Sequence, residues 1–267
     1  MHIQESPLKL VYPSRFANGR TLLLSVIFLC TAAAVAIFLQ RPPLNATIQS
    51  RKLIVQGEPR CYRLVIPKEP VRPTPLIIAF HGIGDTPESM AAYSNLDKLA
   101  ADHGIVLAYP EARRATWSTF NLSESNLESN VDIQFFDALL ADIIAEHGVN
   151  ASRVYVMGMS NGASFAQTLG TVRANKIAAI FAHSGARPPE LAALHYSVPT
   201  ILFVGAKDPI AEDMELDLDI YRRAGANVEY RCIHGLGHQW SARHSRQFWL
   251  RLSRFVLTEN EATGTNQ

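Results

Sequence analysis

Short apolar runs alternate with longer amphipathic segments along most of the chain. Seven of the runs have the length and the β-branched, apolar composition of strands. They lie at residues 61–67, 76–82, 104–110, 153–159, 178–185, 200–208 and 228–235. Several are apolar almost without interruption, and such runs are typical of parallel strands that are buried on both faces.

Most of the intervening segments have the spacing of amphipathic helices. The clearest covers residues 131–148, and Gly148 is expected to end it. Its apolar stripe is formed by Ile133, Phe136, Leu140 and Ile143. Residues 89–104 have a similar pattern and end at Gly104, and the last helix is predicted over residues 241–257.

This order of elements predicts the α/β class, with a mostly parallel central sheet flanked by helices. Residues 53–258 are interpreted as one catalytic domain of ordinary size, and residues 259–267 as a polar tail. No internal repeat is visible, and no insertion is long enough to form a large lid.

The first part of the chain has a different character. Residues 21–39 carry no charge and are long enough to cross the hydrocarbon core of a membrane as a helix. Residues 1–20 contain three basic residues and one acidic residue, which predicts that they stay cytoplasmic while the rest is exported. Residues 40–52 are polar, contain proline, and are interpreted as a stalk.

A cleaved signal peptide is the alternative interpretation of the same segment. Ala34-Val35-Ala36 has the small-residue pattern of a cleavage site, whereas the length of the apolar run favours an uncleaved anchor. Both interpretations predict an extracytoplasmic protein, either membrane-anchored by a single N-terminal helix or secreted after cleavage. In the anchored form the membrane contact is made through residues 21–39.

Composition narrows the function classes. The 267 residues carry a net charge of +1, and no basic patch indicates a nucleic-acid partner. No phosphate-binding loop or metal-type Cys/His cluster stands out, so no cofactor and no metal are expected. Cys61 and Cys232 are predicted on distant strands of the sheet, and therefore not bonded to each other.

The predicted strand at 153–159 runs into Gly158-Met159-Ser160-Asn161-Gly162 and then into a helical segment. A G-x-S-x-G pattern at a sharp strand-to-helix turn raises a serine hydroxyl above the sheet, where a base can reach it. Ser160 is therefore the candidate nucleophile. The pattern is short, and its interpretation depends on partners elsewhere in the chain.

Those partners are expected at the carboxyl ends of the later strands, in the order acid and then histidine. Asp208 ends the strand at 200–208, although an Asp-Pro pair can also be a simple turn. His238 lies in a glycine-flanked loop after the last strand and is the candidate base, with His234 as the reserve. Backbone N–H groups of Ile83 and Asn161 are the candidate oxyanion donors.

A family resemblance rests on four segments, which are RVYVMGMSNGASFA, LIIAFHGIGD, GAKDPI and GLGHQW. Together they resemble the polyhydroxybutyrate depolymerase and feruloyl-esterase-like group of α/β-hydrolases, over roughly residues 55 to 255. The resemblance implies the α/β-hydrolase fold and secreted hydrolysis of carboxylic esters by Ser160, His238 and Asp208. It also implies that Trp117 and Trp240 lie near the site as substrate-binding candidates, although both can equally be packing residues.

The sequence departs from that group at two positions. Ala163 stands where a second glycine is usual, and Ile83 where Cys, Ser or Thr is frequent. The expected substrate is a small-molecule or polymer-end ester. Two alternatives stay open, because a serine peptidase or amidase would use the same residues and a hydrolase fold can also serve as a catalytically silent binding protein.

Overall fold

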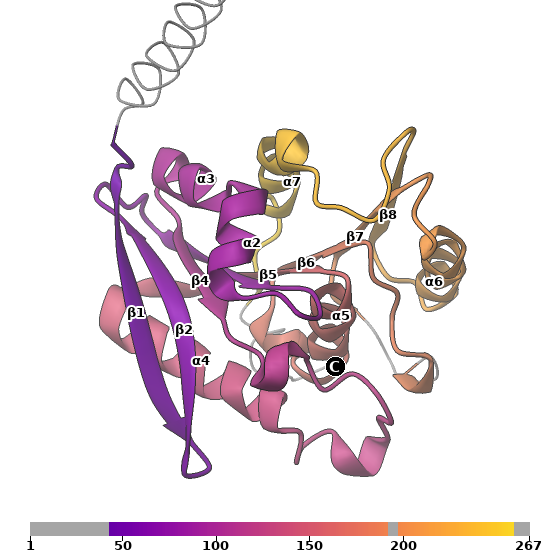
Figure 1. Ribbon diagram of the computed structural model, residues 1–267, viewed down its shortest axis with the longest axis horizontal. Coiled ribbons are helices and arrows are strands. Elements are labelled where there is room, and N and C mark those ends of the chain that lie inside the picture. The colour runs from indigo at the N-terminus through magenta and orange to yellow at the C-terminus, as the bar shows by residue number, and fades with distance from the viewer. Residues whose placement is uncertain (1–42, 192–196, 259–267) are drawn as a thin grey trace, which may run out of the picture. The chain divides into compact units, whose positions relative to one another are not determined.

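Figure 1 shows the computed structural model, which describes residues 43–191 and 197–258. From Leu44 onward, these residues belong to the compact unit Leu44–Gln267. The segments predicted as a cytoplasmic end, a membrane helix and a polar tail lie outside the described residues. Within the described ranges, no helix is long and apolar enough to span a membrane.

In the described part of the chain, eight strands form one sheet in the order β1-β2-β4-β3-β5-β6-β7-β8. The strands are β1 Ala46–Val55, β2 Glu58–Pro67, β3 Thr74–Phe80, β4 Val106–Pro110, β5 Val149–Met159, β6 Ala179–His183, β7 Thr200–Gly205 and β8 Val228–Ile233. β1 and β2 pair antiparallel, β2 pairs antiparallel with β4, and all remaining pairs are parallel. All seven predicted strands are confirmed.

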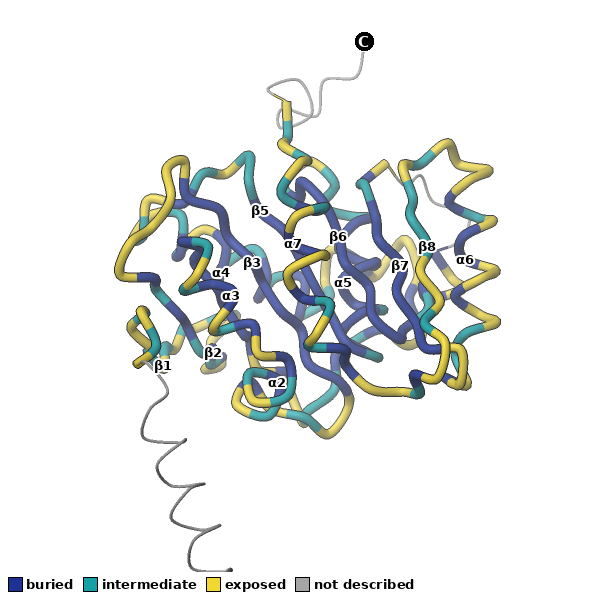
Figure 2. The backbone as a smooth tube through the Cα atoms, turned by 90° about the horizontal axis from the view of Figure 1, so that it is seen from above, coloured by how far each residue is buried: buried dark blue, intermediate teal, exposed yellow. Residues whose placement is uncertain are grey.

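Helices cover both faces of the sheet. They are α2 Pro87–Ser94, α3 Leu96–His103, α4 Val131–His147, α5 Asn161–Val172, α6 Ala211–Arg223 and α7 Ser245–Leu252. Short 3-10 turns lie at Arg113–Ala115, Glu124–Asn126, Ala174–Lys176, Pro189–Leu191 and Ala242–His244. One apolar core lies between the sheet and α4, α5 and α6, and a second lies between the sheet and α2, α3 and α7. The central strands are accordingly buried between two layers (Figure 2).

The stalk predicted over residues 40–52 is wrong from Ala46 onward, because these residues form β1. The strand turns back onto β2 through Gln56 and Gly57, whose φ angles of 52° and 81° suit a two-residue hairpin turn. Pairing with β2 satisfies the backbone of a segment in which half of the side chains are polar. The globular unit therefore begins before the predicted boundary at residue 53.

Two helix predictions also need correction. The single helix predicted over residues 89–104 is two helices, because Asn95 adopts a left-handed conformation with φ 56° between α2 and α3. The last helix is shorter than predicted, since Leu257 bonds back to the carbonyl of Ser152 instead of continuing it. The helix predicted over residues 131–148 is confirmed as α4, which Gly148 ends in a left-handed conformation.

Candidate active site

Ser160 lies at the sharp turn between β5 and α5. Its φ and ψ angles are 55° and −123°, a conformation that non-glycine residues rarely adopt. Its N–H donates to the carbonyl of His183 at 2.9 Å, and its own carbonyl accepts from the N–H of Ala163 at 2.8 Å. Strain of this kind persists only where the surrounding structure holds it.

The glycines around Ser160 allow that close packing. A Cβ atom on Gly158 would lie 2.1 Å from the carbonyl oxygen of Gly162, and one on Gly162 would lie 2.2 Å from that of Phe80. A Cβ on Gly185 would lie 2.1 Å from the carbonyl oxygen of Ser160. The G-x-S-x-G pattern is therefore a packing requirement of this turn, in addition to any chemical role of the serine.

The structure brings Ser160, His238 and Asp208 together, although they are far apart in sequence. Nε2 of His238 lies 3.0 Å from the Ser160 hydroxyl, and Nδ1 lies 2.9 Å and 3.1 Å from the two carboxylate oxygens of Asp208. A carboxylate can only accept, so Nδ1 carries the proton and Nε2 is free to accept from the serine. The side chain of His238 is 43% exposed, and that of Asp208 is fully buried.

Asp208 is held in its ionised form. Burial alone would raise the pKa of its carboxyl, but hydrogen bonds from the Ser184 side chain, the His238 ring and the Ile210 N–H lower it below its ordinary value. The Ile210 N–H donates to Oδ1 at 3.1 Å. A buried carboxylate with several donors can orient an imidazole and stabilise its protonated form.

His81 orients the peptide that precedes Ile83. Its Nε2 accepts from the N–H of Ala112 at 3.1 Å, so Nδ1 carries the proton and donates to the carbonyl of Gly82 at 2.8 Å. Burial lowers the pKa of His81, which keeps the ring neutral. Because C=O and N–H point in opposite directions across a trans peptide, the N–H of Ile83 is turned away from His81.

The N–H groups of Ile83 and Asn161 are available beside the serine. Across the described ranges, neither donates to a protein acceptor. A Cβ placed on Gly82 would lie 3.6 Å from Cβ of Ser160, so the strand-end turn closely approaches the nucleophile candidate. Two free N–H groups at such a position can stabilise a developing oxyanion.

The Asn161 side chain ties a further loop to the site. Its Oδ1 accepts from the N–H of Trp117 at 2.8 Å, and its Nδ2 donates to the Thr119 hydroxyl at 2.7 Å. The Trp117 indole donates to the carbonyl of His81 at 2.9 Å and stacks on Phe165. Trp117 is fully buried, so of the two alternatives for this residue the substrate contact is wrong and the packing role holds, with Trp117 supporting the loops around the serine.

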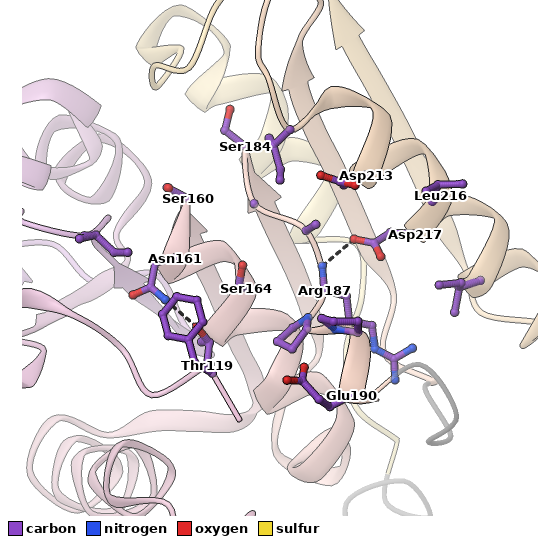
Figure 3. Close-up of a pocket in the computed structure, with 18 of the residues that line it drawn as sticks. Thr119, Ser160, Asn161, Ser164, Ser184, Arg187, Glu190, Asp213, Leu216 and Asp217 are labelled. Carbon is purple, nitrogen blue, oxygen red and sulfur yellow. Dashed lines mark hydrogen bonds between the residues drawn. The ribbon is translucent and has the colours of Figure 1, made fainter. Parts of the chain in front are cut away.

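Two cavities adjoin Ser160, and His238 and Ile83 also line both. The larger has a volume of about 660 Å³ and a mainly apolar wall, with carboxylates contributed by Glu190, Asp213 and Asp217. Figure 3 shows Ser160 and Asn161 on one side of it, and the side chains of α6 on the other.

The smaller cavity has a volume of about 540 Å³ and includes Asp85, Tyr93 and Trp240. Trp240 is therefore near the site as predicted, with its ring stacked on that of His183. The Tyr93 hydroxyl donates to Asp85 at 3.2 Å. A substrate bound at Ser160 can thus extend in two directions.

Asp217 is a buried acid in the wall of the larger cavity. Its Oδ2 accepts from the backbone N–H of Arg187 at 2.6 Å (Figure 3). Burial raises the pKa of Asp217 to about 6, an effect that the Arg187 N–H opposes and nearby Asp213 increases. No pattern in the sequence indicated that Asp213 and Asp217 line a cavity beside Ser160.

The remaining candidates lie away from the serine. His234 is exposed in the turn after β8, and the structure does not bring it to Ser160. Cys61 in β2 and Cys232 in β8 are both free, which confirms the prediction that they are not bonded to each other. The two strands are separated by five others in the sheet.

The chain belongs to the phospholipase/carboxylesterase family, whose model matches residues 61–248. The prediction of the α/β-hydrolase fold is thereby confirmed, and so is that of an esterase at the level of the family.

Among individual proteins, it is 28% identical over 177 residues to NocK of Nocardia uniformis subsp. tsuyamanensis, which is named as an esterase. It is 29% identical over 128 residues to feruloyl esterase B of Neurospora crassa. These regions cover 64% and 47% of this chain, and 52% and 44% of the relatives. The chain therefore spans about half the length of these curated relatives.

Solved structures share the fold. The fluorophosphonate-binding serine hydrolase FphF of Staphylococcus aureus matches 78% of this chain and 98% of its own, with a TM-score of 0.65 and 10% identity. An acetyl xylan esterase from Aspergillus awamori matches 77% of this chain and 98% of its own, with a TM-score of 0.64 and 12% identity.

Proposed function

We propose that the protein is a serine hydrolase of carboxylic esters that works through an acyl-enzyme intermediate. The observation that carries this proposal is the unbroken hydrogen-bond chain from Ser160 through His238 to Asp208, next to two unused backbone N–H groups. This arrangement supplies a nucleophile, a base, an acid that orients the base, and oxyanion donors.

In the first half-reaction, Oγ of Ser160 attacks the ester carbonyl while Nε2 of His238 accepts the hydroxyl proton. Asp208 holds the ring in the required tautomer and stabilises the imidazolium. The tetrahedral oxyanion is stabilised by the N–H groups of Ile83 and Asn161. The alcohol then leaves with the proton from His238, and the acyl group stays on Ser160.

In the second half-reaction, water replaces the alcohol. His238 removes a proton from water as the water attacks the acyl carbonyl, and the same N–H groups stabilise the second oxyanion. Collapse returns the proton to Oγ of Ser160 and releases the carboxylic acid. Apart from the ester and water, the groups that take part in these steps all belong to this chain.

The cavities indicate which esters fit. The larger cavity joins an apolar wall to three carboxylates and the Arg187 guanidinium, so its charged groups are mainly negative and favour neutral or cationic groups over anionic ones. Feruloyl-like and polymer-end esters without a nearby carboxylate remain compatible with it. A curated relative is named for feruloyl esters, which is consistent with such a substrate.

The domain is proposed to act outside the cytoplasm, anchored through residues 21–39 or released after cleavage. The uncharged run and the basic residues before it support this proposal. Protease treatment of intact cells tests it: the tagged domain should be degraded from the outside or found in the medium. A domain that is protected and retained in the cells would contradict it.

The test of activity is pre-steady-state hydrolysis of an excess of short- and long-chain p-nitrophenyl esters by the full-length chain, beside Ser160→Ala. A burst of p-nitrophenol that disappears in the variant is expected, since the acyl-enzyme forms before it hydrolyses. A folded protein that hydrolyses no ester but cleaves a peptide amide would indicate a peptidase. A folded protein inactive on both would indicate a binding protein.

A further inference from the structure

We propose that the larger cavity selects esters that carry an aliphatic ammonium group, which Asp213 and Asp217 of α6 bind beside an apolar wall. The inference rests on the proposed function, and it names the substrate class of the same site. Its basis is that both carboxylates line a cavity of about 660 Å³ that also contains Ser160 and His238. One substrate can therefore reach the nucleophile and the carboxylates together.

α6 presents its two acids on one face. Asp213 and Asp217 are four residues apart in this helix, so their side chains project from the same side, and Figure 3 shows both extending toward the cavity. Asp213 is exposed, whereas Asp217 is only 5% exposed. The Arg187 N–H donates to Oδ2 of Asp217, but within the described ranges no hydrogen bond reaches Oδ1. A buried carboxylate oxygen is thus left without a donor in the wall of the cavity.

The acids around the cavity lack a protein counter-ion. Within residues 43–191 and 197–258, no lysine or arginine forms an ion pair with Asp213, Asp217 or Glu190. Asp219, which lies in α6 but does not line the cavity, pairs with Arg222 at 4.0 Å. A cation that a ligand brings into the cavity would supply the missing partner.

The arginine in the cavity wall is engaged elsewhere. The Arg187 guanidinium donates to the carbonyl of Leu191 and to the hydroxyl of Thr171, and it lies 5.6 Å from the centre of the Tyr221 ring. Its printed contact with Asp217 is made by the backbone N–H, not by the guanidinium. Arg187 therefore contributes one positive charge to the wall without forming an ion pair with that acid.

The titratable groups that line the cavity leave an excess of negative charge. They are Asp213 and Asp217 from α6, Arg187 and Glu190 from the segment after β6, and His238. Burial and the nearby Asp213 raise the pKa of Asp217 to about 6, although Arg187 opposes this rise. Asp217 is thus mostly ionised above that pH, and a bound cation would stabilise its charge.

The apolar part of the wall specifies an organic cation. Ile210, Leu216 and Ile220 lie along the same helix as the two acids and line the same cavity, together with Phe120 and Pro188. An alkyl chain can bury its surface on these side chains while its ammonium group faces the carboxylates. An ester that carries an alkylammonium group complements both features.

The test uses two pairs of esters of equal shape. In the first pair, the acyl chain of a p-nitrophenyl ester ends in trimethylammonium or in tert-butyl. In the second pair, butyrate is esterified to choline or to the tert-butyl counterpart of choline. Relative to hydrolysis by hydroxide, kcat/KM should be higher by about tenfold or more for the cationic member of one pair.

The two pairs also locate the ammonium group. A preference in the first pair places it on the acyl side of the substrate, and a preference in the second places it on the alcohol side. Equal relative rates within both pairs would overturn the inference.

Substitutions in α6 identify the groups that bind the cation. Asp217→Asn still accepts from the Arg187 N–H and should reduce the preference by about threefold or more, and adding Asp213→Asn should abolish it. Asp219→Asn is the matched control, because it removes an equal charge from the same helix outside the cavity, and it should leave the preference unchanged. A preference that survives in the double variant would place the cation elsewhere and overturn the inference.

The pH dependence of the preference is a readout that a structural role of Asp217 would not change. As pH falls through about 6, Asp217 takes up a proton and the preference should decline, because the neutral acid no longer attracts the cation. His238 and Asp208 act alike on both members of a pair, so their titration cancels in the ratio. A constant ratio across this range would contradict the assignment of Asp217.

A cation that is not hydrolysed separates binding from chemistry. In calorimetric titrations, butyltrimethylammonium should bind the full-length chain, with a Kd higher by about threefold or more in Asp217→Asn. No binding to the wild-type protein would overturn the inference. Binding without turnover of any ester would support the cation site and overturn the proposed function.

Discussion

Two parts of the site are built differently: its floor, formed by the turns at Ser160 and Gly185, and its wall, formed by the side chains that line the larger cavity. At the floor, the turns that carry Ser160 and Gly185 are packed so closely that no larger residue fits at the surrounding glycines. At the wall, Ile83, Phe120 and Leu216 are 59%, 65% and 62% exposed. The floor is fixed by backbone contacts, and the wall is set by side chains on separate segments. Residues of the floor should therefore tolerate few substitutions, whereas residues of the wall, which contact the variable part of the substrate, can be substituted more freely.

The largest expected effect at the floor is that of Asp208→Asn. The amide would present an N–H group to Nδ1 of His238 or turn away. The imidazole would then no longer be held in the tautomer that accepts from Ser160, and the imidazolium would lose the negative charge that stabilises it. A fall in kcat of about 10⁴-fold is expected, with an unchanged unfolding temperature. Stopped-flow hydrolysis of a p-nitrophenyl ester would measure it. A loss below tenfold would show that Asp208 does not orient the base.

Gly162→Ala tests the packing of the floor. Its Cβ would lie 2.2 Å from the carbonyl oxygen of Phe80, which is backbone and cannot swing aside. We expect a loss of about 3 kcal/mol in the free energy of unfolding, measured by urea titration. Gly237→Ala is the matched control, since nothing lies within 4 Å of that position. Equal losses in both variants would mean that close packing is not the cause.

Asp217→Asn tests whether the wall carries an unfavourable buried charge. The pKa of Asp217 rises from 3.8 to about 6, so the folded state binds more protons between these values and loses stability as pH rises through that window. Asparagine still accepts from the Arg187 N–H and has no charge to bury. The variant should be more stable by about 2 kcal/mol at neutral pH and by little near pH 4.

Unfolding by urea across this pH range would measure the difference. Asp213→Asn, one helical turn away on the same wall, is the comparison variant, because it removes a charge that acts on Asp217 only from a distance. If Asp217→Asn were destabilising at neutral pH, the carboxylate would be contributing more as a hydrogen-bond acceptor than it costs as a buried charge.

Phe120→Ala should have the smallest effect. Phe120 is mostly exposed at the edge of the larger cavity, so its loss removes apolar contact with a substrate and little packing. We expect kcat/KM to fall about fivefold for a long-chain or aromatic ester and to stay unchanged for an acetate ester. Equal losses on both esters would mean that the larger cavity does not hold the variable part of the substrate.

The sequence predicted the floor better than the wall for a physical reason. Buried strands and the glycines around Ser160 leave local patterns, and chain order then points to Asp208 and His238. The first strand was missed because its polar side chains hide a segment defined by pairing with β2. Trp117 was misassigned because an aromatic residue near a site gives no local sign of whether it faces the core or the cavity.

The surroundings of His183 and Asp217 could not be predicted from sequence. Each accepts from a backbone N–H far away in the chain, that of Ser241 and that of Arg187, and only the fold brings these groups into contact. The wall likewise combines residues from the turn after β3, the loop near Thr119, the turn after β6 and α6. No single segment carries a pattern that reveals this combination.

The most direct test of the central claim is to trap the covalent intermediate. The full-length chain is mixed with a p-nitrophenyl ester, quenched in acid during the burst, and mapped by peptide mass spectrometry. The account predicts one acyl group on Ser160, absent in Ser160→Ala and strongly reduced in His238→Ala. Ester turnover with no acylated peptide, or acylation at another residue, would contradict it.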